Sequence, residues 1–196
     1  MESATSTFGL VERIKQGDRE AFTPLFEKYR RRLAVLVYYK LNSDKRRPDD
    51  VDEILQETFL AAFQDLDQFE YRSAGSFMRW LSGIADHIII DMARFENRQR
   101  RKPAEMLRFR SESNPNGAEP VNSVTPSRVL SQREAVEDLL KNLDALPEQY
   151  REAIVLAKIE GLSTLELAER LGKTREAAAL LLHRAIQRFR ELQDRR

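Results

Sequence analysis

The chain has 196 residues and a formal net charge of +1, from 33 Lys and Arg against 32 Asp and Glu, so its length allows one domain or two small ones. It has no cysteine and two histidines, which excludes disulfides and cysteine nucleophiles and argues against a histidine metal cage. No stretch approaches the ~20 apolar residues of a membrane span. We therefore expect a soluble, cytoplasmic protein with no metal, no cofactor and no membrane insertion.

The first predicted unit, residues 8–102, has the apolar pattern of helices. Apolar residues in 22–37 recur every three or four positions, which places them on one face of a helix. Similar series lie in 49–66 and 76–95. No useful stretch alternates apolar and polar residues as a strand does. We therefore expect these helices to share one core in an all-α fold.

A predicted linker separates this unit from a second one at residues 128–196. Residues 103–127 hold four of the seven prolines, together with asparagines and serines, and cannot sustain a helix. The second unit is predicted to begin with a helix that ends at Leu143. Pro147 suits the first turn of the next helix, which should stop at Gly161.

The end of the second unit has the outline of a helix-turn-helix. Ser163 and Glu166 fit a capping box at the start of a short helix that ends at Leu171. Gly172 then provides a turn, and a long basic helix begins near Thr174. This outline is typical of DNA-binding proteins, although helical hairpins with other roles share it.

The near-zero net charge combines three blocks of opposite sign. Residues 49–70 contain eight acidic residues and no Lys or Arg. Residues 94–110 contain seven basic residues and two acidic ones, and residues 170–196 contain eight and three. Such asymmetry favours different partners on different surfaces, with the basic blocks suited to phosphates. The alternative is that these are simply the solvated faces of charged helices.

Each block suggests candidate residues. Clustered carboxylates in 52–57 favour a protein-binding face, because no phosphate loop or histidine ligand set accompanies them. Aromatic residues and arginines along 69–101 suit single-stranded nucleic acid, whose bases stack on rings, although Phe77 and Trp80 also have the spacing of core residues. In the long basic helix, residues 174–177 would face base edges, while His183, Arg184 and Arg188 would contact phosphates. A plain helical bundle with a basic tail is the alternative there.

Three motifs occur in order along the chain. They are DEILQETFLAAF at 52–63, FMRWLSGIADH at 77–87 followed by Asp91 and Arg94, and LPEQYRE at 146–152 with EGLS at 160–163, LAERLG at 167–172 and HRA at 183–185. In this order and spacing they resemble the extracytoplasmic-function (ECF) sigma factors of bacterial RNA polymerase. The resemblance covers most of residues 8–101 and 128–192.

The resemblance implies a two-domain transcription-initiation factor that is not an enzyme and has no catalytic residues. The first unit would bind the β′ clamp helices of core RNA polymerase through Asp52, Glu53, Gln56, Glu57 and Phe59. It would open and hold the −10 promoter element through Tyr71, Phe77, Trp80, His87, Asp91, Arg94, Arg98 and Arg101. The second unit would contact the β flap and read the −35 element through Thr174, Arg175, Glu176, Ala177, His183, Arg184 and Arg188. The family also suggests an anti-sigma factor as a partner, and a nucleoid location within the holoenzyme.

Two positions depart from the family pattern. Many members have asparagine where this chain has His87, at a position implied in recognising a flipped −10 base. Members often carry basic residues at the positions aligned with Ala179 and Leu181, whereas residues 178–182 of this chain are apolar. We expect at least one of these leucines to face away from the local core, which would weaken phosphate contacts or supply a protein contact.

Two other functions are compatible with parts of the sequence. A stand-alone helix-turn-helix regulator would bind duplex DNA without polymerase, but it has no use for an acidic helix. A carboxylate-dependent helical enzyme would use the acidic cluster for metal binding or acid–base chemistry, but the cluster lacks convincing ligand spacing.

Overall fold

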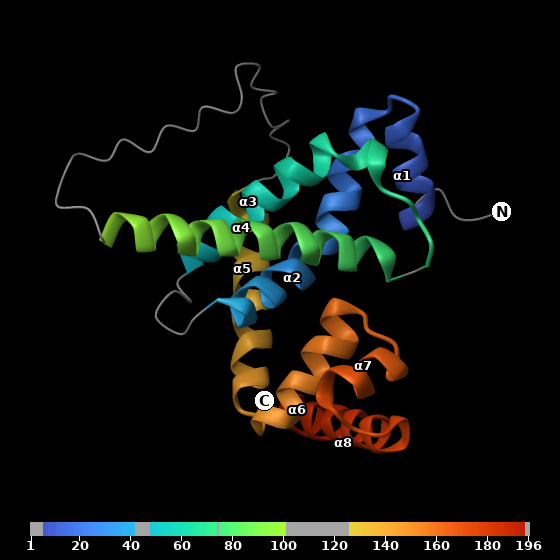
Figure 1. Ribbon diagram of the computed structural model, residues 1–196, viewed down its shortest axis with the longest axis vertical. Coiled ribbons are helices and arrows are strands. Elements are labelled where there is room, and N and C mark those ends of the chain that lie inside the picture. The colour runs from blue at the N-terminus through green and yellow to red at the C-terminus, as the bar shows by residue number, and fades with distance from the viewer. Residues whose placement is uncertain (1–5, 42–47, 74, 101–125, 195–196) are drawn as a thin grey trace.

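The computed structural model describes residues 6–41, 48–73, 75–100 and 126–194, which form helices and the turns that join them (Figure 1). No strand occurs in these ranges, and the predicted all-α fold is confirmed. The greater part of the predicted linker, residues 103–125, lies outside the described residues. None of the described helices is both long enough and apolar enough to pass through a membrane.

Within the described residues, four α-helices and two short 3₁₀ turns make up the N-terminal unit. They are α1 (Thr7–Lys15), η1 (Arg19–Ala21), α2 (Phe22–Lys40), α3 (Pro48–Gln64), η3 (Leu66–Gln68) and α4 (Ser76–Arg100). The three apolar faces predicted from the sequence meet in one core, where Leu33 of α2, Ile54 of α3 and Leu81 of α4 are fully buried. The structure adds α1, which packs on α2. Ser6 caps the start of this helix, and its hydroxyl accepts a hydrogen bond from the Gly9 amide at 3.0 Å.

The C-terminal unit consists of α5 (Pro126–Asp144), α6 (Glu148–Ile154), η4 (Val155–Glu160), α7 (Thr164–Leu171) and α8 (Arg175–Gln193). The single helix predicted over 147–160 is divided, because the six residues of η4 take a π-helical form. This segment ends at Gly161 with φ +91°, a left-handed conformation that favours glycine. The short helix, glycine turn and long helix predicted for 163–193 are confirmed as α7, Gly172 and α8.

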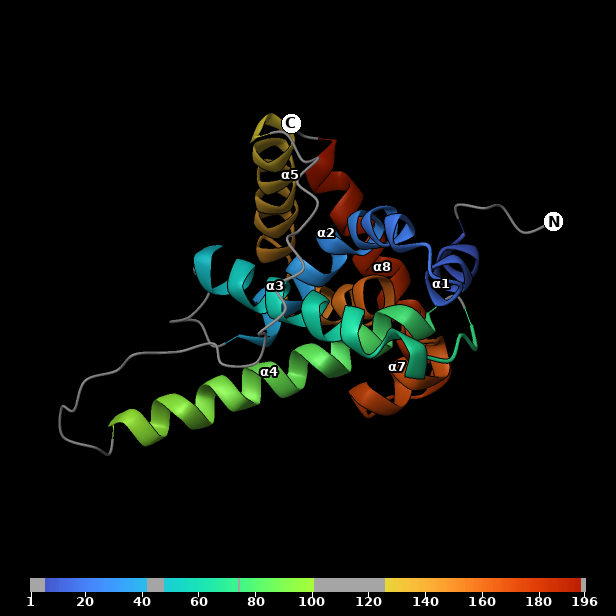
Figure 2. The same cartoon turned by 90° about the horizontal axis from the view of Figure 1, so that it is seen from above.

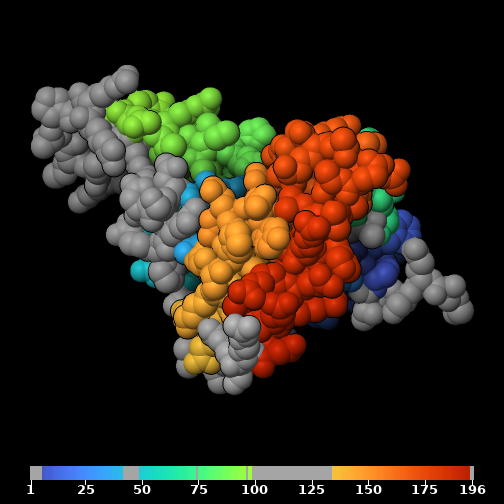
Figure 3. Space-filling model, turned by 90° about the horizontal axis from the view of Figure 1, so that it is seen from below, coloured from blue at the N-terminus to red at the C-terminus, as the bar shows by residue number. Residues whose placement is uncertain are grey.

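The two units pack against each other through a shared hydrophobic cluster. Leu143, Leu146, Ile154, Val155 and Ile159 of the C-terminal unit belong to the same cluster of buried residues as the core of α2, α3 and α4. Figure 2 shows α5 beside α2, and α8 packs on α5 and α6. The C-terminal helices cover most of the face of the molecule seen from below (Figure 3).

Polar contacts line the seam between the units. Arg32 Nη2 donates a hydrogen bond to the Ile159 carbonyl at 2.9 Å. Arg79 Nη1 donates to the Gly161 carbonyl at 3.3 Å, and Ser82 Oγ donates to Glu160 Oε1 at 3.3 Å. These polar contacts of α4 with the C-terminal unit therefore come from its first two turns.

Gly75 allows this close approach. A methyl group at Gly75 would lie 3.1 Å from the Gly161 carbonyl oxygen and 2.9 Å from Arg79 Nη1. The Gly161 carbonyl oxygen belongs to the backbone, so it cannot move aside as the flexible side chain of Arg79 can. A side chain at this position would therefore push the two units apart.

The capping box at α7 gives a pH-dependent prediction. Glu166 Oε2 accepts a hydrogen bond from the Ser163 amide at 2.7 Å, and the amide and hydroxyl of Ser163 lower the pKa of Glu166 below its ordinary value. Glu166→Gln keeps an acceptor but loses the charge, so we expect it to lower the free energy of unfolding by about 0.5 kcal/mol at neutral pH. Because the folded pKa is lowered, this difference should be present above about pH 4.3 and vanish as pH falls through the lowered value.

Urea denaturation at pH 7 and pH 3 measures this difference. Glu169→Gln on the same helix is the matched control, since its side chain is exposed and has no part in the capping box. Equal behaviour of the two variants at both pH values would contradict the capping role of the ionised Glu166.

Candidate functional surfaces

An acidic row runs along the exposed side of α3. Glu53, Gln56 and Glu57 are exposed and follow each other within one turn. Asp52, at the edge of the row, lies 3.8 Å from Arg30 Nη2 of α2. Partial burial, and then the charge of Glu53, raise the pKa of Glu57 above its ordinary value. The row therefore presents concentrated negative charge to the solvent.

The burial of Phe59 and the exposure of Leu60 differ from the sequence prediction, which assigned Phe59 to the polymerase-binding surface. The structure places Phe59 in the core, 3% exposed and packed against Phe26, so it supports α3 from inside and does not reach a partner. Leu60 is 48% exposed and continues the row of Glu53, Gln56 and Glu57 at helical spacing. Leu60 is absent from the residues predicted to bind polymerase, although its spacing from Glu53 and Glu57 is the signal that could have identified it.

A second row lies along the exposed half of α4. His87, Asp91, Arg94 and Arg98 are exposed and follow each other at steps of three or four residues, which places them on one face. Asp91 pairs with Arg94 at 3.3 Å. His87 Nδ1 lies 2.7 Å from the Gly83 carbonyl, which fixes the ring and leaves Nε2 to face outward. This end of α4 extends beyond the other helices (Figures 1 and 2), and the predicted Arg101 lies outside the described residues.

The aromatic residues at the start of α4 form a cluster. Phe77 is 2% exposed and packs on Tyr29, Phe69 and Trp80, with ring centroids 4.8, 5.2 and 5.6 Å away. The structure therefore assigns Phe77 to the core rather than to a nucleic-acid surface, because apolar spacing at this position serves packing. Trp80 and Tyr71 are each half-buried, so each keeps part of its ring accessible.

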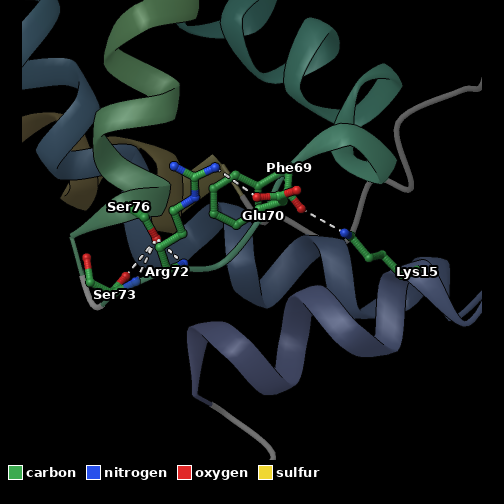
Figure 4. Close-up of polar contacts among 6 residues, drawn as sticks. All are labelled: Lys15, Phe69, Glu70, Arg72, Ser73 and Ser76. Carbon is green, nitrogen blue, oxygen red and sulfur yellow. Dashed lines mark hydrogen bonds and ion pairs between the residues drawn. The ribbon is translucent and has the colours of Figure 1, made fainter.

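The turn that leads into α4 is held by polar contacts (Figure 4). Lys15 of α1 donates a hydrogen bond to the Phe69 carbonyl at 2.7 Å, and Arg72 pairs with Glu70 at 2.9 Å. Ser76 Oγ donates to the Ser73 carbonyl at 2.7 Å and accepts from two backbone amides, those of Arg72 and Ser73. These contacts fix the chain on either side of Tyr71, whose ring packs edge-on against Phe8 of α1 with the ring centroids 5.4 Å apart.

The helix-turn-helix has its own small core. Leu167 and Ala168 of α7 pack with Leu156 and with Ala178 of α8. The turn is closed by Gly172, with φ +61°, and by a hydrogen bond from the Lys173 amide to the Ala168 carbonyl at 2.9 Å. Thr174 caps α8, its hydroxyl accepting from the Ala177 amide at 3.2 Å.

Exposed side chains on α8 fall into two neighbouring rows. Glu176 and His183 lie in the row opposite the buried Ala178 and Ala185. Ala177, Arg184 and Arg188 form a second row beside it, in which Arg188 pairs with Glu191 at 2.7 Å. Arg175 is exposed at the first turn of the helix. The two rows therefore bring five of the predicted −35 residues to neighbouring faces, whereas Arg175 lies on the other side of the helix from Arg184.

Comparisons with known proteins agree with the resemblance. The family profile described as ECF sigma factor matches residues 4–193. The ECF RNA polymerase sigma factor SigD of Mycobacterium tuberculosis (strain ATCC 25618 / H37Rv) is 30% identical over 183 residues, which are 93% of this chain and 81% of that protein. The ECF RNA polymerase sigma-E factor of Escherichia coli (strain K12) is 30% identical over 161 residues, or 81% of this chain and 79% of that protein.

A solved structure of CnrH in complex with the cytosolic domain of CnrY aligns over 97% of both chains, with 24% identity and a TM-score of 0.46. The family assignment depends on the sequence comparisons, in which both the profile and the relatives span more than two thirds of the chain. The chain therefore belongs to the ECF sigma factor family, whose members direct RNA polymerase in promoter-specific transcription initiation.

Proposed function

We propose that this sigma factor works through three separate surfaces. The acidic row of α3 binds the clamp helices of the polymerase β′ subunit, the exposed row of α4 holds the −10 element, and the first turns of α8 read the −35 element. The observation that carries this proposal is the placement of charge along these three helices: Glu53 and Glu57 are exposed on α3, whereas Arg94 and Arg98 are exposed on α4, and Arg175 and Arg184 on α8. Acidic rows repel phosphates and basic rows attract them, so polymerase and DNA are directed to different helices.

The α4 row suits an opened DNA strand. Arg94 and Arg98 supply positive charge for phosphates, and the accessible edges of Trp80 and Tyr71 provide surfaces on which unpaired bases stack. The outward Nε2 of the anchored His87 is a hydrogen-bonding atom for a base. Phe77 supports Trp80 from the core. The side chains for holding a melted segment thus lie along one helix and the turn before it.

The α8 surface suits duplex DNA. In a helix-turn-helix, the first residues of the second helix face base edges in the major groove. Arg175 can donate two hydrogen bonds to a guanine, and Glu176 can accept one from a cytosine. Arg184 lies a row away, where it can pair with phosphates. Residues 8–102 would thus act on polymerase and the −10 element, and residues 128–196 on the −35 element and the β flap.

Catalysis has no part in this proposal, because the phosphodiester chemistry remains in the polymerase. An anti-sigma partner stays a prediction of the family resemblance. The stand-alone regulator is not favoured, because it leaves the acidic row of α3 without a use.

Arg175→Ala tests the −35 assignment. We expect about a tenfold loss of initiation from promoters with an intact −35 element in a reconstituted assay, because a bidentate contact contributes about 1–3 kcal/mol of discrimination. Binding to core polymerase, measured separately, should be unchanged. The matched control is Arg19→Ala, an exposed arginine on η1 in the other unit.

Two outcomes would contradict the −35 assignment. One is full activity of the Arg175→Ala protein on such promoters. The other is an equal loss of activity in the Arg19→Ala control, which would show that the assay responds to net charge rather than to the −35 contact.

A further inference from the structure

An exposed leucine stands at the centre of the outer face of α8. Leu180 is 49% exposed, whereas Ala178 is fully buried and Leu182 packs on the hydrophobic core. Leu180 is therefore the leucine that the sequence predicted to face away from the local core. No other residue of α8 covers the side chain of Leu180.

The residues around Leu180 indicate what kind of partner covers it. Glu176 and His183 lie four residues before it and three residues after it, in the same row. Arg184 lies in the adjoining row, four residues after Leu180, and forms no ion pair within the described part of the chain. An apolar group beside a cation without a partner suits duplex DNA, because the cation meets a phosphate while the centre of the face enters the groove.

The chemistry of the major groove limits what Leu180 can contact. Its side chain has no hydrogen-bonding atom, so it can recognise only an apolar group. The base edges of the major groove offer one such group, the 5-methyl of thymine. We infer that Leu180 contacts the 5-methyl group of a thymine in the −35 element and thereby determines which base is accepted there. This inference depends on the proposed function of α8.

The position of the thymine follows from the geometry of the helix. Residues four apart on a helix have Cβ atoms about 5–6 Å apart, and neighbouring bases on a strand lie about 3.4 Å apart along the axis. Leu180 therefore contacts a base within about two base pairs of the one that Glu176 contacts. A glutamate in this setting accepts from the amino group of cytosine.

The test removes the methyl group from DNA and the leucine from the protein. The full-length chain and core polymerase are assayed by run-off transcription on a promoter whose start site has been mapped with this sigma factor. Each thymine of the −35 element, on both strands, is replaced in turn by deoxyuridine, which lacks only the 5-methyl group. With the wild-type protein, we expect the replacement at one position to lower initiation about fourfold. This factor corresponds to the free energy of burying one methyl-sized group away from water.

The Leu180→Ala protein should show no further loss when the same thymine is replaced, because the contact is already absent. The matched control is Leu165→Ala, an equally large leucine that is 58% exposed on α7, and it should keep the full sensitivity to deoxyuridine. Circular dichroism checks that both variants are folded.

Two results would overturn the inference while leaving the proposed function intact: no sensitive position with an active wild-type protein, or an undiminished sensitivity in Leu180→Ala. No promoter-specific initiation by the wild-type protein would overturn the proposed function and, with it, this inference.

Discussion

Replacing Glu53 and Glu57 together by lysine is expected to weaken binding to core RNA polymerase at least tenfold. Both side chains are exposed on α3, and neither forms an ion pair within the described residues. The pKa of Glu57 is raised, so its ionised form is less favourable in the folded chain than in the unfolded chain. Reversing two charges at a complementary interface removes attraction and adds repulsion.

Titration of labelled protein with core polymerase measures this effect. A matched double variant, Glu20→Lys with Asp67→Lys, makes the same change in net charge at two exposed acids outside α3 and should bind normally. Because the attraction is electrostatic, the difference between the two double variants should shrink as salt is raised. Equal affinities of the two variants at low salt would rule out α3 as the polymerase-binding surface.

Leu143→Ala is expected to lower the free energy of unfolding by about 2–5 kcal/mol, the range for deleting a buried leucine side chain. Leu143 lies on α5 of the C-terminal unit, yet it is fully buried in the cluster that also contains the core of the N-terminal unit. The substitution should therefore destabilise both units. Trp80, the single tryptophan of the chain, reports on the N-terminal unit by its fluorescence.

Urea unfolding followed by Trp80 fluorescence and by far-ultraviolet circular dichroism distinguishes a shared core from two independent ones. With Leu143→Ala, both transitions should move to lower urea together. Leu167→Ala is the matched control, because Leu167 is equally buried but belongs to the separate small core of α7 and α8. It should shift the fluorescence transition less. A fluorescence midpoint unmoved by Leu143→Ala would contradict the packing of the two units.

Periodicity in the sequence was sufficient to predict the elements that pack locally. The apolar series of α2, α3 and α4, the capping box of Ser163 and Glu166, and the glycine turn at Gly172 all depend on residues close together in the chain. The seam between the units was not predicted. The contacts of Arg32 with Ile159 and of Ser82 with Glu160 join positions far apart in the sequence, and no local pattern signals them.

The candidate surfaces, too, were predicted only as far as local spacing allows. Spacing placed Glu53, Glu57, Arg94 and Arg98 on helical surfaces, and the structure exposes them. Spacing alone did not distinguish an aromatic residue that faces a partner from one that supports the fold. Phe77 was therefore proposed for DNA contact, although its ring completes a cluster with residues from α2 and from the turn before α4.

Run-off transcription by core polymerase, with and without this protein, tests the central claim most directly when the start sites are mapped on DNA of the host genome. The account predicts that the protein directs initiation to defined start sites that share one pair of −35 and −10 sequences, and that the isolated protein does not select these sites without polymerase. Initiation that is unchanged by the protein would contradict the account, and so would tight, specific promoter binding by the protein alone.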